Sequence, residues 1–580
     1  MQPKPAQIGR LTRARFSKAV RQFADSEVGG KAKMLFAWLL VLLLGINALN
    51  VAISYVGRNF MTAIAHRDMP EFWRQTVFYV GVFGVCTVVS VLQRYTEERL
   101  GLVWRAWLTQ RLVTTYLEHP IYYRLTDHIL ENGEIANPDQ RITEDVRVFT
   151  TTTLSFVLMV LNGLFTVVAF SGVLWSISPS LFAFAVVYAV VGTLLTIALG
   201  SRLIGLNSRQ LDQEADFRAE LIHVRENSES VALLRHESRL RERILRPLGE
   251  LTANLLKIIG VNRNLGFFTT GYNYLIQIIP ALLVAPLFIR GEVEFGVITQ
   301  SAMAFSALLG AFSLIVTQFQ SISSFAAVIS RLGALAEAAE QAQAPSAIDI
   351  RHGGNKIEYQ HLTLASRRDR RVLISDLTLT IECGTRVLVI GPEEPKVALF
   401  RVTAGIWDSG NGGVARPNAA SIFFLAERPY VPPGTLREFL VPAGRNPMLS
   451  ASRINAALEA VGAAAISARA GGLGVERHWD DLLSLGEQQL LSFARVVLAV
   501  PCFAILDRVG TALTPVQVEQ LLTVLNLHSI SYVHFADEET GVSRDHYDAV
   551  LELAADGTWK WNRTGSDPAT APAAAQAPAV

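Results

Sequence analysis

The sequence predicts a helical membrane domain followed by an α/β domain. Long apolar runs fill the first half of the 580-residue chain, and half of all residues are hydrophobic. The mean hydropathy of +0.30 is high for a soluble protein. In the second half, TRVLVIGP and CFAILD are short apolar runs that end in turn residues, as the buried strands of an α/β domain do.

Six apolar runs indicate the membrane domain, which we expect over residues 34–334. A helix needs about 20 apolar residues to cross a bilayer. The six runs are 34–56, 76–92, 154–177, 181–201, 265–289 and 295–330. The second is the shortest, because Gln93, Arg94 and Glu97 follow it closely. None contains Asp or Glu, which argues against a proton relay in mid-membrane. Glu97 and Glu98, just after the second run, remain as the candidate carboxylates.

The distribution of basic residues predicts the orientation and the remaining boundaries. Positively charged segments stay on the cytoplasmic side. Residues 1–33 and the long segments after the second and fourth runs are rich in Lys and Arg, so we expect them, and the second half, in the cytoplasm. The charged segments look like helices that continue from the membrane. An Ala- and Gln-rich linker is expected at 335–354, and a disordered tail at 564–580.

Charge and cysteine content exclude several classes of function. The formal net charge is only +1, which argues against a general affinity for nucleic acid. Cys86, Cys383 and Cys502 are far apart in the sequence and suggest neither a CxxC metal site nor a disulfide framework. A polar patch at 272–277, inside the fifth run, fits helix–helix hydrogen bonds as well as it fits a solute cavity.

Several stretches of the first half resemble a known family. RAWLTQRLV, YYRL, NPDQRITEDV at 137–146 and DFRAELIHVRENSESVA at 216–232 resemble the membrane domain of SbmA/BacA-like ABC proteins and peroxisomal acyl-CoA transporters, over about 72–332. The resemblance implies an ABC exporter-like, six-helix half-transporter of a bacterial inner membrane. It also implies dimerisation and uptake of peptides, cobalamin-like molecules or other bulky solutes. The charges at 139–145 suit either a salt-bridged helix surface or a coupling element.

The second half, over 355–563, resembles an ABC nucleotide-binding domain of the P-loop NTPase type. LSLGEQQ at 483–489 is similar to the ABC signature, and FLAERPY, GTLREFL and CFAILD surround it in the order that this family shows. The resemblance implies that Ser484, Gly486 and Gln488 face a nucleotide bound by the opposite subunit. Helix N-termini attract anions through free N–H groups and the helix dipole.

The phosphate loop departs from the family pattern. A working loop reads GxxxxGK[ST], and its backbone amides curl round the phosphates. The stretch from Gly391 to Lys396 is one residue short, and Pro395 replaces the glycine before the lysine. Glu393 and Glu394 would repel phosphate, and the position after Lys396 has no hydroxyl to hold Mg²⁺. We therefore expect Gly391 and Lys396 to bind nucleotide poorly.

The other family positions are changed in part. Asp507 stands where the resemblance implies a Mg²⁺ ligand, but Arg508 replaces the catalytic glutamate and cannot act as a base. Glu427 replaces a glutamine, and His534 is the candidate for the switch histidine. We expect no intact catalytic set in a homodimer. ATP and Mg²⁺ would bind only at a composite site, where an intact partner half-transporter uses the signature. Proton-coupled transport and a non-transporting scaffold are the alternatives.

Overall fold

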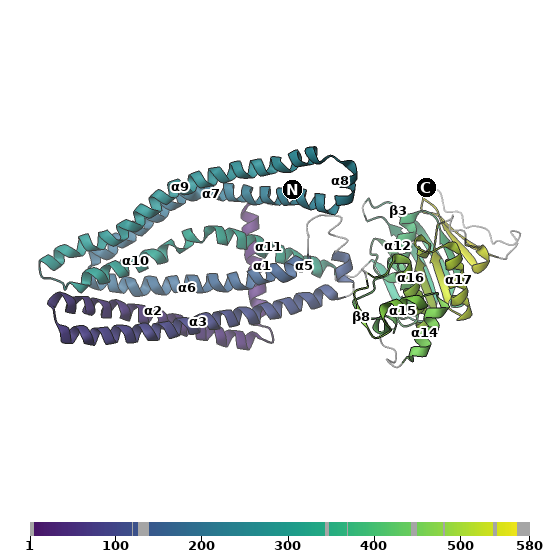
Figure 1. Cartoon of the computed structure of the whole chain (residues 1–580), viewed down its shortest axis with the longest axis horizontal. Helices are drawn as coiled ribbons and strands as arrows, with labels where there is room; N and C mark the ends of the chain where they lie inside the picture. Colours follow the sequence, from purple (N-terminus) through teal and green to yellow (C-terminus); the bar gives the residue numbers. More distant parts are fainter. Residues whose placement is uncertain are drawn as a thin grey trace. The chain divides into compact units, whose positions relative to one another are not determined.

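The computed structural model describes residues 5–118, 120–125, 138–342, 347–367, 369–441, 449–479, 482–537 and 542–564. The chain divides into two compact units. The first comprises residues 1–121 and 132–341, and the second comprises residues 122–131 and 342–580. Figure 1 shows the first as a bundle of long helices and the second as an α/β fold. Residues 565–580, expected to form a disordered tail, lie outside the described part.

Five helical segments of the described chain are long and apolar enough to cross a membrane. They are α2 (Gly29–His66), α3 (Met69–Leu117), the run Pro138–Ile177, the apolar part Pro179–Asn207 of α7 (Pro179–Glu226), and α9 (Glu237–Ile289). The run Pro138–Ile177 consists of α5 (Pro138–Gln140), a π-helical turn η1 (Arg141–Asp145) and α6 (Val146–Ile177). The shorter helix α10 (Gly296–Thr317) is apolar over Gly296–Phe312. The predicted helical membrane domain is therefore confirmed, with five candidate spans and one shorter apolar helix among the described residues where about six spans are expected.

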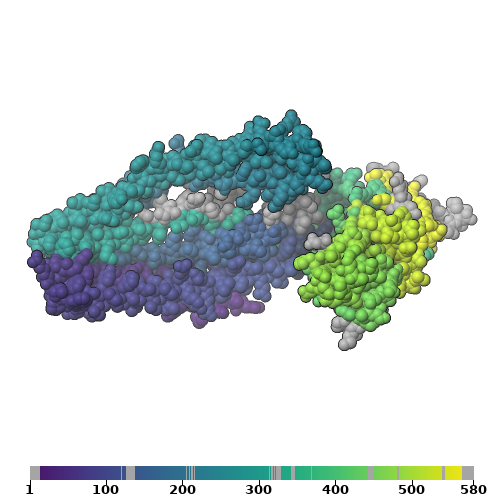
Figure 2. Space-filling view, in the orientation of Figure 1, coloured from purple at the N-terminus to yellow at the C-terminus, as the bar shows by residue number. Residues whose placement is uncertain are grey.

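The helices extend well beyond their apolar parts, as the sequence predicts. The lengths of α3, α7 and α9 are 49, 48 and 53 residues, so each is about 70–80 Å long at 1.5 Å per residue. The pair α7 and α9, joined by α8 (Ser228–Leu234), packs side by side and forms the teal arm in Figures 1 and 2. Inside this pair Tyr188 and Tyr272 stack with ring centroids 4.3 Å apart. Each tyrosine hydroxyl donates to the other's carbonyl, so Tyr272 of the 272–277 patch joins two helices.

Two boundaries differ from expectation. The sixth apolar run is not one helix, because α10 ends at Thr317 and α11 (Phe319–Ala342) begins after it. The stretch at 335–354, expected to be a linker, contains the end of α11 and the strand β1 (Ile348–His352). Alanine has the highest helix propensity, so an Ala-rich stretch extends a helix readily. The basic N-terminal segment contains helix α1 (Pro5–Ala24), whose Arg15 pairs with Glu337 of α11 at 2.7 Å.

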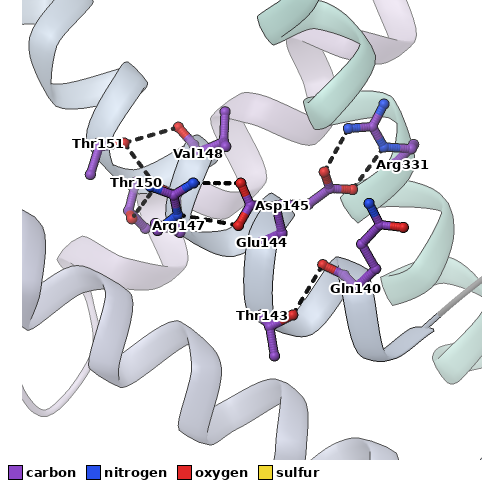
Figure 3. A network of polar contacts seen from close by, with 9 residues as sticks. All are labelled: Gln140, Thr143, Glu144, Asp145, Arg147, Val148, Thr150, Thr151 and Arg331. Atoms are coloured by element: carbon purple, nitrogen blue, oxygen red, sulfur yellow. Dashed lines mark hydrogen bonds and ion pairs between the residues drawn. The ribbon is translucent and has the colours of Figure 1, made fainter. Parts of the chain in front are cut away.

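The segment that was expected either to couple the domains or to form a salt-bridged surface packs within the first unit. Asp145, at the end of η1, accepts two hydrogen bonds from Arg331 of α11, at 2.6 and 2.7 Å (Figure 3). The neighbouring Glu144 pairs with Arg147 at 2.5 Å, one turn along the same helix. Asn137 lies outside the described residues. Two charged residues of this segment, Glu144 and Asp145, therefore form ion pairs, and Asp145 is nearly buried.

The second unit contains two main sheets. The six-stranded sheet has the order β12-β11-β4-β10-β9-β6, and all its pairs are parallel except β11–β12. The four-stranded sheet has the order β1-β5-β2-β3, and β7 pairs with β8. The strands not yet given bounds are β2 (Lys356–Ala365), β3 (Val372–Glu382), β4 (Arg386–Ile390), β5 (Gly410–Arg416), β6 (Ile422–Leu425), β7 (Gly434–Thr435), β8 (Glu476–Arg477), β9 (Phe503–Asp507), β10 (Ser531–Phe535), β11 (Ala549–Leu553) and β12 (Trp559–Arg563).

Buried strands explain the short apolar runs. Successive side chains of β4 point to opposite faces, so Val387 and Val389 join one hydrophobic cluster while Leu388 and Ile390 join another. A strand buried on both faces reads as a continuous apolar run. The helices of this unit are α12 (Glu393–Ala404), α13 (Leu436–Leu440), α14 (Ala451–Ala460), α15 (Ala464–Ala470), α16 (Leu485–Ala499), η2 (Val509–Thr511), α17 (Pro515–Leu527) and η3 (Arg544–His546). The α/β class is thus confirmed.

One expectation about the cysteines is wrong. Cys383 and Cys502 form a disulfide across a sequence separation of 119 residues, with their Cα atoms 6.0 Å apart. The two residues precede β4 and β9, which flank β10 in the sheet. Sequence spacing did not reveal the pair, because strand order, rather than distance along the chain, brings the two strand starts together.

Candidate functional site

The carboxyl edge of the six-stranded sheet gathers most of the predicted site residues. Gly391 follows β4, Asp507 ends β9, and Glu427 comes two residues after β6. These strands run in parallel with β10 between β4 and β9, so their carboxyl ends lie along one edge. Ligands of open α/β sheets bind at this edge. The geometry at these residues therefore determines what the site can hold.

The connection from β4 to α12 consists of only Gly391 and Pro392. Gly391 has φ 134°, and a Cβ added to it would lie 2.2 Å from the carbonyl oxygen of Leu553. Glycine is thus required there for close approach to β11. Pro392 and Pro395 have no backbone N–H. A two-residue connection with one N–H offers no curled run of amides for a phosphate chain.

Lys396 lies in the first turns of α12 but points into the domain. Its residue surface is only 2% exposed. The Nζ atom donates to the carbonyl oxygen of Ala536 at 3.0 Å and pairs with the carboxylate of Asp537, both just beyond β10. The ammonium group is therefore bound by the two residues that follow β10.

Arg508 occupies the centre of the site. Its guanidinium contacts Glu393 at 2.5 Å, Glu427 at 2.6 Å and Asp507 at 3.6 Å. Burial raises the pKa of the Asp507 carboxyl, and the positive charge of Arg508 opposes that rise. We call these four residues the Arg508 cluster. It holds the ends of β6 and β9 and the start of α12 together through one internal cation.

The Arg508 cluster does not fit Mg²⁺ and a triphosphate. The guanidinium already faces the carboxylate that would hold the metal, and Glu393 lies at the helix start where phosphate would bind. Glu394, next to it, pairs with Arg371 at 2.6 Å. The N-terminus of α12, which attracts anions, is therefore occupied by two carboxylates of the chain itself. Among the described residues there is no group of three or more His, Cys, Asp or Glu side chains suited to a metal ion.

His534 is part of the core of the α/β unit. It lies in β10 with 1% of its surface exposed, and its Nδ1 shares a 2.7 Å hydrogen bond with the hydroxyl of Tyr547. Burial, and then the charge of Lys396, lower the pKa of His534 to about 4. The imidazole is therefore neutral at physiological pH. In the sheet His534 lies opposite Leu506, the residue before Asp507, and its side-chain hydrogen bond is made with Tyr547.

The signature residues form a complete helix start. Ser484 caps α16 by accepting from the backbone N–H of Glu487, and the Glu487 carboxylate accepts from the N–H of Ser484 at 2.9 Å. Ser484 is exposed, and the Gln488 amide donates to the carbonyl oxygen of Leu483. A Cβ added at Gly486 would lie 2.9 Å from the carbonyl oxygen of Ala512. This reciprocal capping leaves a formed, accessible helix N-terminus.

Sequence reasoning missed the partners that neutralise the site. The sequence predicts that Glu393 repels phosphate and that Glu427 replaces a glutamine, whereas in the structure both pair with Arg508. Asp537 and Tyr547, which hold Lys396 and His534, were not singled out. One signal was available: relative to the family pattern, a carboxylate is lost at 508 and one is gained at 427. Such a charge exchange indicates a new ion pair.

Comparisons with known proteins agree with this architecture. Residues 23–289 match the family described as ABC transporter transmembrane region 2. An uncharacterized ABC transporter ATP-binding protein of Synechocystis sp. is 36% identical and covers 91% of this chain and 81% of its own length. ABC transporter D family member 2, chloroplastic, of Arabidopsis thaliana is 33% identical, covering 91% and 84%. The lysosomal cobalamin transporter ABCD4 of Mus musculus is 26% identical, covering 88% and 90%.

The two-unit fold and these matches define a multi-span membrane protein of the half-transporter class. One membrane unit is followed by one α/β unit in a single chain. The chain belongs to the ABC transporters that carry transmembrane region 2 and an ATP-binding-type domain, the group that includes the D family.

Proposed function

We propose that this half-transporter moves bulky hydrophilic solutes as part of a dimer, while its own nucleotide site does not hydrolyse ATP. The observation that carries the proposal is the two-residue connection between β4 and α12, with Lys396 buried against the end of β10. Phosphoryl transfer depends on positioning and on stabilising charge. Here Lys396 and the N-terminus of α12, which would provide that positioning and charge, make contacts with other groups of the α/β unit.

The proposed division of labour is asymmetric. Family resemblance implies that each ABC site combines the phosphate loop of one subunit with the signature of the other. Ser484 and Gly486 lie on a formed helix start, whereas Asp507 is held by Arg508. A partner with an intact loop would complete one working site with this chain's signature. The second site, built on the Arg508 cluster, would stay inactive.

The solute is proposed from the relatives. One relative is named a cobalamin transporter, and the resemblance of the membrane half to SbmA/BacA-like proteins adds peptides as a second class. The basic segments favour a cytoplasmic position for the N-terminus and the α/β unit in a bacterial inner membrane.

The first test is steady-state ATP hydrolysis by the full chain, purified alone in lipid nanodiscs. The Asp507→Asn variant is the blank, and binding of a fluorescent ATP analogue is measured in parallel. We expect a rate equal to the blank and no saturable binding. A rate well above the blank would show that the connection folds round phosphate, and the proposal would fail.

ATP-independent transport is a second candidate function. The Arg508 cluster favours it, because a self-neutralised site needs neither metal nor nucleotide. Solute uptake that is abolished by an uncoupler, but persists after ATP depletion, would select this candidate over the asymmetric dimer.

A further inference from the structure

A cavity of about 630 Å³ lies in the membrane unit between α3 and α6. Its lining includes Glu97, Gly101 and Arg105 of α3, and Thr151, Leu154 and Ser155 of α6. The size is that of a small-molecule pocket. The lining also contains Arg94 and Glu98, which pair with each other at 3.2 Å. It therefore combines two acidic and two basic side chains with hydroxyl groups and an apolar middle, and the cavity suits a ligand with charged ends.

Two of the four charged side chains in this cavity lie outside the Arg94–Glu98 pair. The partly buried Glu97 carboxylate accepts only an amide hydrogen bond, from Gln93 at 3.1 Å. Within the described residues, neither Glu97 nor Arg105 takes part in an ion pair. Glu144 interacts electrostatically with Arg105, but its carboxylate is paired with Arg147 at 2.5 Å. Glu97 and Arg105 are therefore the groups with charge to offer a ligand.

The spacing of Glu97 and Arg105 specifies the shape of that ligand. The two residues are eight positions apart on one helix, which corresponds to about 12 Å along the axis. Between them lie Gly101 and, from α6, Leu154. A matching ligand is a linear zwitterion whose ammonium and carboxylate stand roughly 10 Å apart across an apolar spacer.

The position of the cavity along α3 favours a soluble ligand over a lipid headgroup. The apolar run of this helix ends at Leu92, so Glu97 lies about 7 Å and Arg105 about 20 Å beyond it. The headgroup layer is only about 5–8 Å thick on each side of the bilayer. Arg105 therefore stands beyond the headgroups, where a lipid bound by its phosphate would not reach.

We propose that the cavity between α3 and α6 binds a linear zwitterionic solute, with its ammonium on Glu97 and its anionic end on Arg105. The site rests on the proposed transport function, because it would hold a solute at the cytoplasmic end of the membrane helices. It is independent of the state of the Arg508 cluster.

The test is equilibrium binding of 8-aminooctanoate to the full chain in nanodiscs. This probe has charged ends about 10 Å apart when extended. Octanoate and octylamine carry one charge each, and glycine has both charges close together. We expect saturable binding of 8-aminooctanoate that is at least about tenfold tighter than that of the three controls, the scale of one charge-assisted hydrogen bond. Equal binding of octanoate would overturn the proposal.

Variants assign the two ends. Glu97→Gln and Arg105→Gln should each weaken binding of 8-aminooctanoate about tenfold, while Arg99→Gln, on the same helix outside the lining, should leave it unchanged. Gly101→Leu should abolish binding by filling the cavity. A Cβ at Gly101 meets only Leu154, at 4.0 Å, which is an ordinary van der Waals contact, and the melting temperature of the variant reports whether the chain stays folded. If Glu97→Gln and Arg105→Gln bind like the parent chain, the site is not the one described.

A second arm separates the lipid source. Nanodiscs of phosphatidylethanolamine and of phosphatidylglycerol should give the same affinity for 8-aminooctanoate. Competition only by phosphatidylethanolamine would assign the cavity to a headgroup and refute a soluble ligand. Because binding is measured without ATP, its failure is distinct from an unexpected ATPase rate, which would refute the proposed function instead.

Discussion

Arg508 changes the role of the residues around it. In a metal-binding site Asp507 and Glu427 would be ligands. Here they contact the guanidinium of Arg508, which is part of the chain itself. Arginine presents a planar fork of donors that suits several carboxylate oxygens at once. The cluster is therefore a structural joint between α12, β6 and β9, and its contribution should be visible as stability.

Removing that guanidinium should destabilise the α/β unit. Arg508→Ala leaves Asp507 and Glu427 facing each other without a countercharge, at a cost of about 1–2 kcal/mol. We expect the apparent melting temperature of the full chain to fall by several degrees. Glu394→Gln, which breaks only the exposed pair with Arg371, is the control and should change little. An unchanged melting temperature for Arg508→Ala would contradict the structural role.

His534 gives the α/β unit a dependence on acid pH. Its pKa in the folded state is about 4, below the ordinary value of 6.5, because the ring is buried. The unfolded chain therefore binds a proton first as the pH falls. The contribution of the neutral His534 to the free energy of unfolding is fully present above pH 6.5. It is lost progressively as the pH falls toward 4, by up to roughly 3 kcal/mol.

The measurement is thermal unfolding of the full chain from pH 7.5 to 5, compared with His534→Leu. The variant loses the hydrogen bond to Tyr547, so its melting temperature should be lower at pH 7.5. Its decline toward pH 5 should be shallower than that of the parent chain. Parallel pH curves would mean that His534 is not the titrating group.

At the scale of elements, the start of α12 limits any repair of the site. Replacing Arg508 by glutamate supplies a carboxylate at the position of the family's general base. It cannot lengthen the connection between β4 and α12 or turn Lys396 outward. Arg508→Glu should therefore hydrolyse ATP no faster than the Asp507→Asn blank in nanodiscs. A clear gain in rate from this single change would refute the account of the connection.

The contact between η1 and α11 is a second element-scale feature. Asp145 is nearly buried, with 7% of its side chain exposed, and accepts both hydrogen bonds of the Arg331 fork. Asp145→Asn removes the carboxylate charge and leaves the Arg331 guanidinium without its counterion. The substitution should therefore lower the stability of the membrane unit by about 2 kcal/mol.

Glu144→Gln is the matched control for that change. It breaks the neighbouring pair with Arg147, whose side chains are about half exposed, and should alter stability by less than about 0.5 kcal/mol. Both variants are compared by unfolding in nanodiscs. Equal effects would show that burial of Asp145 does not strengthen its pair.

For the whole molecule, the asymmetric dimer makes a prediction about two substitutions in one chain. In the complex purified through a tag on this chain from its native membrane, Ser484→Arg should reduce ATP hydrolysis at least about tenfold, because it blocks the helix start offered to the partner. Asp507→Asn should leave the rate unchanged. The opposite pattern would place the working site on this chain, and equal sensitivity would point to two working sites.

Much of the architecture was accessible from the sequence, because it depends on patterns with one physical solution. Apolar runs too long for a soluble helix gave the membrane unit, and two-sided burial of strands such as β4 gave the α/β class. The break after Thr317 was not accessible, since no Gly or Pro stands near it and the residues on both sides can continue a helix.

The site was accessible only in part. The shortened loop and the change at Arg508 are visible along the chain, and the capping of Ser484 by Glu487 follows from local spacing. The pairing of Arg508 with Glu393 and of Lys396 with Asp537 depends on which strand ends meet at one sheet edge. The Cys383–Cys502 bond was missed for the same reason.

The connection between β4 and α12 also has an evolutionary consequence. A substituted side chain can revert by one base change, but a missing backbone residue returns only by an insertion at the same place. Glu393 and Glu427 meanwhile depend on Arg508, so each has to change together with another. On the proposed function, single substitutions therefore cannot return this site to ATP hydrolysis, because the connection also needs an inserted residue.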